Sequence, residues 1–180
     1  DGTMSFKKAT GSFVLSDATP LTDVGYMEIG GSVTSAFAGV GGIGFELTDV
    51  TFAIVMVSDT KGTPATTDDV NYMALKADVG SAALVGIDGL TAQITSLSVE
   101  VNNTNDTVSP NRVLDFAGAN SRDVATGPAP APVVTIDIDG AEGVLLSVAT
   151  NISLDVFGFV QLDGTMSFKK ATGSFVLSDA

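Results

Sequence analysis

Three short acidic or amide-rich segments hold the residues whose types and spacing could do chemistry. They are "DIDGAEG", "TTDDVN" and "NNTNDT", and their candidate side chains are Asp137, Asp139, Glu142, Asp68, Asp69, Asn103, Asn105 and Asp106. Calcium prefers several carboxylate and carbonyl oxygens, which flexible Asp- and Asn-rich turns supply. Ordinary turn chemistry also explains each segment by itself, because Asp and Asn favour turns through local hydrogen bonds. The sequence therefore nominates these eight residues as calcium ligands without requiring a metal.

The first of these segments could also hold a catalytic carboxylate pair. Asp137 and Asp139 lie two residues apart, so their side chains share a face if the segment is a strand, as a glycosidase-like pair could. The alternative is that both carboxylates point to solvent while Ile136 and Ile138 point inward. The chain has no histidine and no cysteine, which excludes Ser-His-Asp and Cys-His catalysis, disulfides and thiolate metal sites. We therefore expect no enzyme, and no cofactor unless calcium binds.

The chain is strongly acidic, with 21 Asp and Glu residues against 8 Lys and Arg residues and a formal net charge of −13. Such a field attracts cations and disfavours contact with nucleic-acid phosphates or anionic lipid. No stretch of the sequence is long and apolar enough to span a bilayer. We therefore expect neither a nucleic-acid partner nor a membrane span.

The elements that must position these residues are strands, because the apolar residues alternate with a period of two. In "LTAQITSLSVEV" the apolar positions change parity at Thr95 and Ser96, and in "IGFELTDVTFAI" they change at Thr48 and Asp49. A strand that keeps one face buried past such a break must bend or bulge there. We predict an all-β, mainly antiparallel architecture of coiled or sandwich-like sheets stacked end to end. The alternative is a β-solenoid, whose coils bury similar short apolar triplets.

Turn signals divide the chain further. Gly41-Gly42 and Asp88-Gly89 each lie between two apolar runs, which is the signal of a two-residue hairpin. Further hairpin turns are expected at Asp139-Gly140 and Asp163-Gly164.

Three internal quasi-repeats follow from the recurring pattern, at about 26–57, 72–103 and 134–162. Turn-rich or Pro-flanked composition predicts loop or linker segments at 58–69 and 102–132. The second of these is expected to be a long surface loop with at most one short strand.

The first eighteen residues of the chain recur, letter for letter, at its end. "DGTMSFKKATGSFVLSDA" occupies residues 1–18 and again 163–180, which gives a period of 163 − 1 = 162 residues. We therefore interpret 1–162 as one full repeat and 163–180 as the start of the next identical copy. Such β modules can stack end to end, close each other's sheet edges and add length with each copy.

Segments such as "YMALKADVGSAALVGIDGLTAQITSLSVEVN" and "NISLDVFGFVQLDGTMSFKKATGSFVLSD" resemble the long repeats of giant secreted bacterial surface proteins, the large adhesin and haemagglutinin-like chains. The resemblance covers the whole chain and rests on repeat style and composition. It implies an extracellular location at a bacterial surface. The chain lacks the glycine-rich calcium nonapeptide that some of these proteins carry elsewhere.

Together these observations predict the structural repeat of a long extracellular fibre, surface stalk or matrix filament. Its expected partners are neighbouring copies of the same repeat, with lateral assembly into a filament as a further expectation. The alternative is a ligand- or glycan-binding adhesin repeat, stabilised by calcium, that uses the Pro-flanked loop 102–132. That loop contains a single aromatic residue, Phe116, which favours the structural hypothesis.

Overall fold

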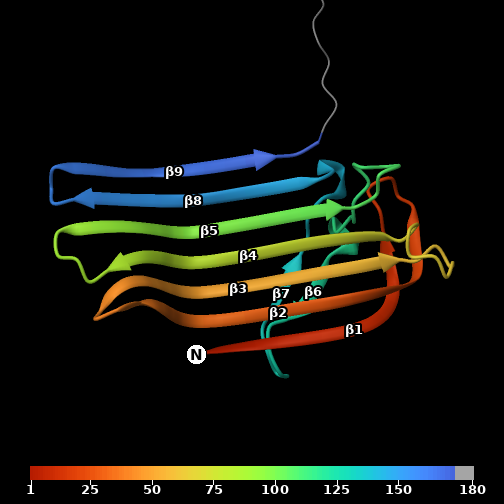
Figure 1. Cartoon of the computed structure of the whole chain (residues 1–180), viewed down its shortest axis with the longest axis horizontal. Coiled ribbons are helices and arrows are strands. Elements are labelled where there is room, and N and C mark those ends of the chain that lie inside the picture. Colours follow the sequence, from red (N-terminus) through yellow and green to blue (C-terminus); the bar gives the residue numbers. More distant parts are fainter. Residues whose placement is uncertain (173–180) are drawn as a thin grey trace, which may run out of the picture.

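The computed structural model describes residues 1–172, which form nine strands and two short 3₁₀ helices. The elements are β1 (Gly2–Val14), β2 (Pro20–Val40), β3 (Ile43–Asp59), β4 (Val70–Val85), β5 (Leu90–Thr104), η1 (Gly118–Asn120), β6 (Arg122–Ala125), β7 (Val133–Ile136), η2 (Gly140–Glu142), β8 (Leu145–Val156) and β9 (Val160–Lys170). Seven strands form one antiparallel sheet in the order β1-β2-β3-β4-β5-β8-β9, and β6 and β7 form a separate hairpin (Figure 1). The predicted all-β, mainly antiparallel class is confirmed. The described residues form neither a closed barrel nor a solenoid.

Tight turns with left-handed backbone connect neighbouring strands. Gly41 and Gly42 have φ of 64° and 84° between β2 and β3, a conformation that glycine adopts without steric cost. Gly89 has φ of 79° between β4 and β5. The two-residue hairpin predicted at Gly41-Gly42 is therefore confirmed. A turn also falls at Asp88-Gly89, but it spans the four residues 86–89 between β4 and β5 instead of two.

The other two turn predictions are wrong. Asp163 and Gly164 lie inside β9, because their pairing with Ser153 and Ile152 of β8 continues the ladder. The turn between β8 and β9 falls earlier, near Gly158. Asp139 instead caps η2, since its side chain accepts a hydrogen bond from the Ala141 N–H at 2.8 Å.

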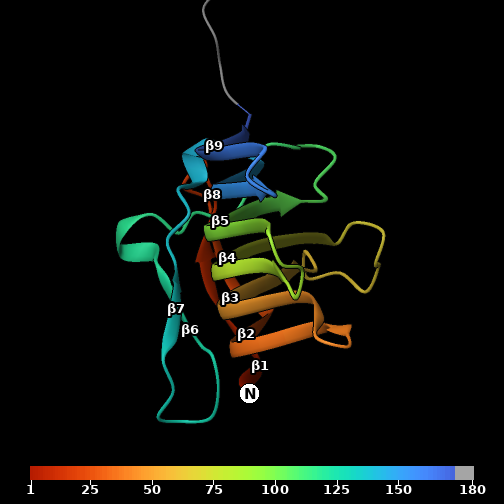
Figure 2. The ribbon, with the colours of Figure 1, turned by 90° about the vertical axis from the view of Figure 1, so that its left-hand side faces the viewer.

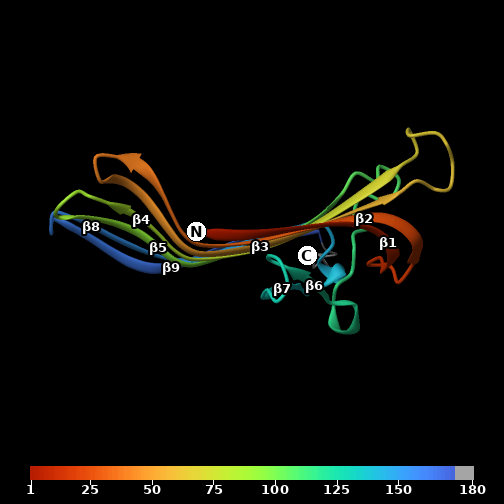
Figure 3. The same cartoon turned by 90° about the horizontal axis from the view of Figure 1, so that it is seen from below.

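The long strands bend along a line that crosses the sheet (Figure 3). Asp49 and Ser96, at the two predicted parity breaks, have φ of 52° and 54°. Gly80 lies opposite Asp49, where a Cβ atom would come 2.9 Å from the Asp49 Cβ, so this close approach requires glycine. The predicted bends are confirmed. We call the strand segments on the side of this line that faces β6 and β7 the covered half. The segments that end at the turns Gly41-Gly42 and Asp88-Gly89 form the open half.

The core lies between one face of the covered half and residues 105–144, which we call the cover segment. The β6–β7 hairpin of this segment lies across the strands (Figure 2). The fully buried core side chains come from both layers and include Val55, Val57, Tyr72, Leu114, Phe116, Val124 and Ile136. Phe13 makes edge-to-face contacts with Tyr26 and Phe116. One apolar layer therefore holds the cover segment on the sheet.

Much of the cover segment was predicted to be a surface loop, and the structure differs. Val113, Leu114, Phe116 and Val124 are all buried at 1% exposure or less. Their spacing follows neither a strand nor a helix period because most of the backbone here is irregular. Periodicity therefore gave no sign that these residues complete the core.

Candidate functional site

The calcium candidates lie at three separate places in the structure. Asp68 and Asp69 belong to the loop between β3 and β4, Asn103, Asn105 and Asp106 to the end of β5, and Asp137, Asp139 and Glu142 to the connection from β7 to β8. Asp68 accepts a hydrogen bond from the Thr63 hydroxyl, and Asp69 Oδ1 is buried without a partner. Within residues 1–172 no three acidic side chains converge as an ion site would require.

The third place is a shallow groove of ≈ 280 Å³ in which acidic and basic side chains alternate. Lys76 Nζ lies 2.6 Å from Asp137 Oδ1, and Lys169 Nζ lies 2.7 Å from Glu142 Oε2. These ion pairs already engage two of the candidate carboxylates, and the two ammonium groups oppose a divalent cation. The donor set is that of a salt-bridge network, and calcium binding stays a prediction.

The same segment shows how Asp137 and Asp139 are placed. Both side chains are exposed, whereas Ile136 and Ile138 are 0% and 3% exposed. The solvent-facing alternative for the two carboxylates is therefore confirmed. Both carboxylates line the shallow groove, where Lys76 engages Asp137.

Asp106 is 6% exposed and closes the loop after β5. Its carboxylate accepts hydrogen bonds from the backbone N–H groups of Ser109 at 3.0 Å and Val108 at 2.9 Å, and from Arg112 Nη2 at 3.0 Å. The Ser109 N–H above all, with Val108 and Arg112, holds the pKa of Asp106 below its ordinary value despite burial. Its stabilising contribution is therefore complete above the ordinary carboxyl pKa and is lost as the pH falls through the lowered folded value. Asp106 thus has a structural role that needs no metal.

The two neighbouring asparagines also serve the backbone. Asn105 Oδ1 accepts a hydrogen bond from the Asn71 N–H at 2.7 Å, and Asn103 Oδ1 accepts one from the Thr104 N–H at 2.8 Å. The first of these ties the loop after β5 to the start of β4. Both asparagines, like Asp106, therefore act locally in shaping this corner of the sheet.

A buried charge cluster anchors the β6–β7 hairpin to the sheet. Glu28 is 5% exposed, and its carboxylate accepts a hydrogen bond from Arg122 Nε at 2.6 Å. Lys7 Nζ lies 3.3 Å from the other carboxylate oxygen. The Arg122 guanidinium also lies over the rings of Tyr26 and Phe13, 4.6 Å and 5.1 Å from their centroids. Arg122 therefore joins the cover segment to β1 and β2 through charge and through aromatic contact.

The repeated segment occupies both outer positions of the sheet. Residues 1–8 enter β1, which pairs with β2, and the identical residues 163–170 enter β9, which pairs with β8. Lys7 in β1 and its counterpart Lys169 in β9 both reach acidic groups on the covered face, namely Glu28 and Glu142. The same sequence is thus strand-forming at both edges and presents the same face to the cover.

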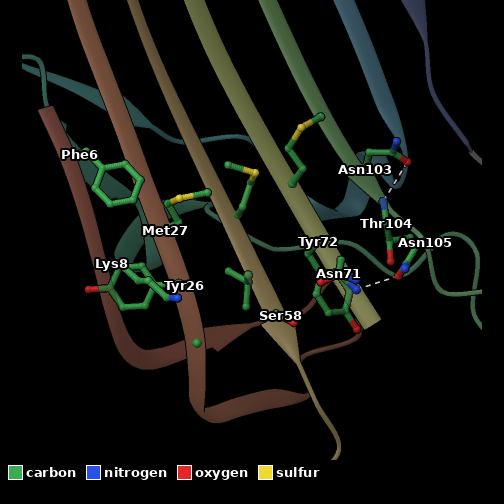
Figure 4. Close-up of a pocket in the computed structure, with 14 residues that line it drawn as sticks. Phe6, Lys8, Tyr26, Met27, Ser58, Asn71, Tyr72, Asn103, Thr104 and Asn105 are labelled. Carbon is green, nitrogen blue, oxygen red and sulfur yellow. Dashed lines mark hydrogen bonds between the residues drawn. The ribbon is translucent and has the colours of Figure 1, made fainter. Parts of the chain in front are cut away.

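The opposite face of the covered half carries apolar side chains over which residues 1–172 place no second layer; we call it the uncovered face. One row across the strands is Phe6, Ile29, Ile54, Leu75, Val101 and Leu146, and the next is Lys8, Met27, Met56, Met73 and Asn103. Phe6 and the residues of the second row line an open groove of ≈ 690 Å³ (Figure 4). These two rows contain no acidic residue although the chain is strongly acidic, and depletion of charge is typical of an interface core.

Sequence reasoning missed both the buried charge cluster and the uncovered face. The stretch "AIVMV" in β3 was the available signal for the second, because consecutive apolar residues indicate a strand that is apolar on both faces. No comparable signal marked Arg122 and Glu28, which lie 94 residues apart in the chain.

In the part of the chain that the structure describes, no helix has the length and apolar character needed to cross a membrane. Comparison with protein-family models, with curated proteins and with solved structures finds no match for the chain.

Proposed function

We propose that this chain is the repeat unit of a long extracellular fibre, surface stalk or matrix filament, in which one antiparallel sheet runs through successive copies. The observation that carries this proposal is that one sequence forms both outer strands of the sheet. The β9 strand of one copy is, in this proposal, the β1 strand of the next.

The geometry allows one strand to play both parts. β1 and β9 are six places apart in an antiparallel order, so they run in the same direction. Lys7 and Lys169 both point to the covered face. Because β1 and β9 run in the same direction and turn the same face toward the cover segment, their two hydrogen-bonding edges are oriented in the same way. β2 therefore uses one edge of this strand and β8 uses the other, and both can pair with it at once.

Two further features support the continuous sheet. Pairing of β1 with β2 begins at Gly2 opposite Val33, which leaves the open half of β2 without a partner on that side. In the array, residues 160–162 of the preceding copy, which come just before the repeated segment in β9, would lie along this unpaired part of β2. In the array each Lys7 would also lie between its own Glu28 and the Glu142 of the preceding copy, closing a charge bridge across the joint.

The proposal gives the fibre a definite dimension. Each period contributes six strands to the main sheet, β1 to β5 and β8. At a strand spacing of about 4.8 Å, one period would advance the fibre by about 29 Å. The only free sheet edges would be at the ends of the array, which limits unwanted edge pairing.

Other parts of the functional hypothesis rest on the residues of the uncovered face. Its methionine and aliphatic rows suit an apolar partner such as the same face of another array, which supports lateral association of fibres. The glycan-binding alternative relies on the loop 102–132, whose one aromatic residue, Phe116, is buried in the core and is not presented to a ligand. Glycan binding therefore ranks second to the structural role. The extracellular location in this proposal rests on the resemblance to the repeats of bacterial surface proteins.

A disulfide across the joint tests the proposal. Ala149 of β8 pairs with Ser167 of β9, both residues are small, and the chain has no cysteine of its own. We expect Ala149→Cys with Ser167→Cys to form a disulfide under mild oxidation in the 180-residue chain. We expect the same bond to form to the same extent in a chain extended by a second full period.

The control pairs Ala149→Cys with Met166→Cys, because Met166 lies on the other face of β9 and should not form the bond. If the bond forms in the 180-residue chain but not in the two-period chain, the shared strand pairs with β2 of the second copy and no longer with β8 of the first. That result would refute the continuous sheet.

A further inference from the structure

The tip of the β6–β7 hairpin, residues 127–132, projects past the outer strand β1; we call it the hairpin tip (Figures 1 and 2). Just before the tip, the Thr3 hydroxyl donates to the Thr126 carbonyl at 2.9 Å, and the Ser5 hydroxyl donates to the Ala125 carbonyl. Thr126 closes the tip through its N–H and hydroxyl, which both donate to the Pro132 carbonyl. The hairpin is thus held on β1 immediately before it passes beyond the edge.

The composition of the hairpin tip is unusual for a free protrusion. It reads "GPAPAP", carries no charge and exposes Pro128, Ala129, Pro130 and Pro132. Its prolines lack an N–H group, so this backbone leaves few donors that need a partner. Gly127 passes so close to β1 that a Cβ atom on it would lie 2.7 Å from Thr3 side-chain atoms. A stiff, uncharged tip of this kind is suited to lie against another surface.

The opposite edge of the sheet offers a matching surface. Thr165 and Ser167 of β9 are the counterparts of Thr3 and Ser5. They pair with Asn151 and Ala149 of β8, which are both exposed. This part of β8 therefore presents a shelf of small side chains on the covered face, at the place where a following copy would hold its own hairpin.

We propose that the hairpin tip of each copy docks on β8 of the preceding copy, over Ala149 and Asn151, and straps the joint between them. This inference rests on the proposed continuous sheet, because placing the next copy's β1 on β9 fixes the position of its hairpin. The preceding copy's η2 does not stand in the way. Its Glu142 contacts Lys169, which lies further along β9 than Ser167 and Thr165. The tip and η2 would then lie side by side over one strand.

Cross-linking between copies tests the strap in a chain of two periods. One cysteine replaces Asn151 in the first copy, and one replaces Ala129 in the second copy. We expect a short bis-maleimide to link them in most molecules at a protein concentration where links between chains are rare. The matched control moves the first cysteine to Leu146, which lies on the uncovered face of the same strand and should give no link.

The disulfide between Ala149→Cys and Ser167→Cys, measured in a separate two-period chain, separates the two proposals. A joint disulfide without the strap link would overturn the strap and leave the continuous sheet standing. Failure of the joint disulfide would overturn both. A link that forms equally well from the Leu146→Cys control would also overturn the strap. It would show that the link does not depend on docking against the covered face of β8.

Discussion

Ser167→Pro and Phe168→Pro should have different effects in one period and the same effect in two periods. The N–H groups of consecutive strand residues point to opposite edges of the strand. In the 180-residue chain β9 has one partner, β8. Only the proline that removes an N–H pointing to β8 should then destabilise the chain strongly, by about 1–3 kcal/mol, because it leaves a carbonyl of β8 without its partner. In a two-period chain the shared strand has a partner on each edge, so both variants should lose a ladder hydrogen bond. Their free energies of unfolding should then decrease by a similar amount.

Urea unfolding of both variants and their parents, at both chain lengths, measures this effect as the change in free energy of unfolding. The unsubstituted two-period chain should unfold in one transition, with an m value close to twice that of the single period, because m scales with the surface exposed. If the variant that is tolerated in one period is equally tolerated in two, the shared strand pairs on only one edge. The central claim would then fail.

Arg122→Ala should lower the free energy of unfolding of the 180-residue chain by about 3–5 kcal/mol, because it leaves the buried Glu28 carboxylate without its closest partner. Lys7 remains 3.3 Å from that carboxylate. The substitution also removes the contacts of the guanidinium with Tyr26 and Phe13. Equilibrium denaturation in urea measures the loss.

A double variant distinguishes loss of the charge pair from general damage to the fold. Glu28→Gln with Arg122→Met removes both charges and keeps comparable volume, so it should recover most of the lost stability. A single variant as stable as the parent, or a double variant no better than the single, would contradict this role of the cluster.

The regular half of the fold could be predicted because its information is local. Alternation of apolar residues identified the long strands, and parity changes located the bends at Asp49 and Ser96, where the backbone becomes left-handed. Gly41-Gly42 also predicted its turn, since glycine suits positive φ at both central positions. At the third hairpin, pairing with β8 placed Asp163-Gly164 within the strand, so the long-range ladder outweighed the local signal.

The rest depends on contacts between distant residues. Nothing near Phe116 or Val124 indicates that these side chains lie against the sheet, because the backbone that carries them has no regular period. The sequence also could not separate metal ligation from turn formation at the calcium candidates, and calcium binding stays a prediction. The carboxylates of Asp106 and Asp139 accept hydrogen bonds from backbone N–H groups of their own loops, as turn-forming Asp residues often do. Spacing alone does not separate that role from metal ligation.

The most direct test of the continuous sheet is cryo-electron microscopy of a chain with several tandem periods. A continuous sheet should give an unbroken filament with strands across its axis at about 4.8 Å and an axial repeat of about 29 Å, six strands for each period. A filament of two such layers would further show that the uncovered faces pair. Separate beads on flexible joints, with no constant axial spacing, would contradict the account.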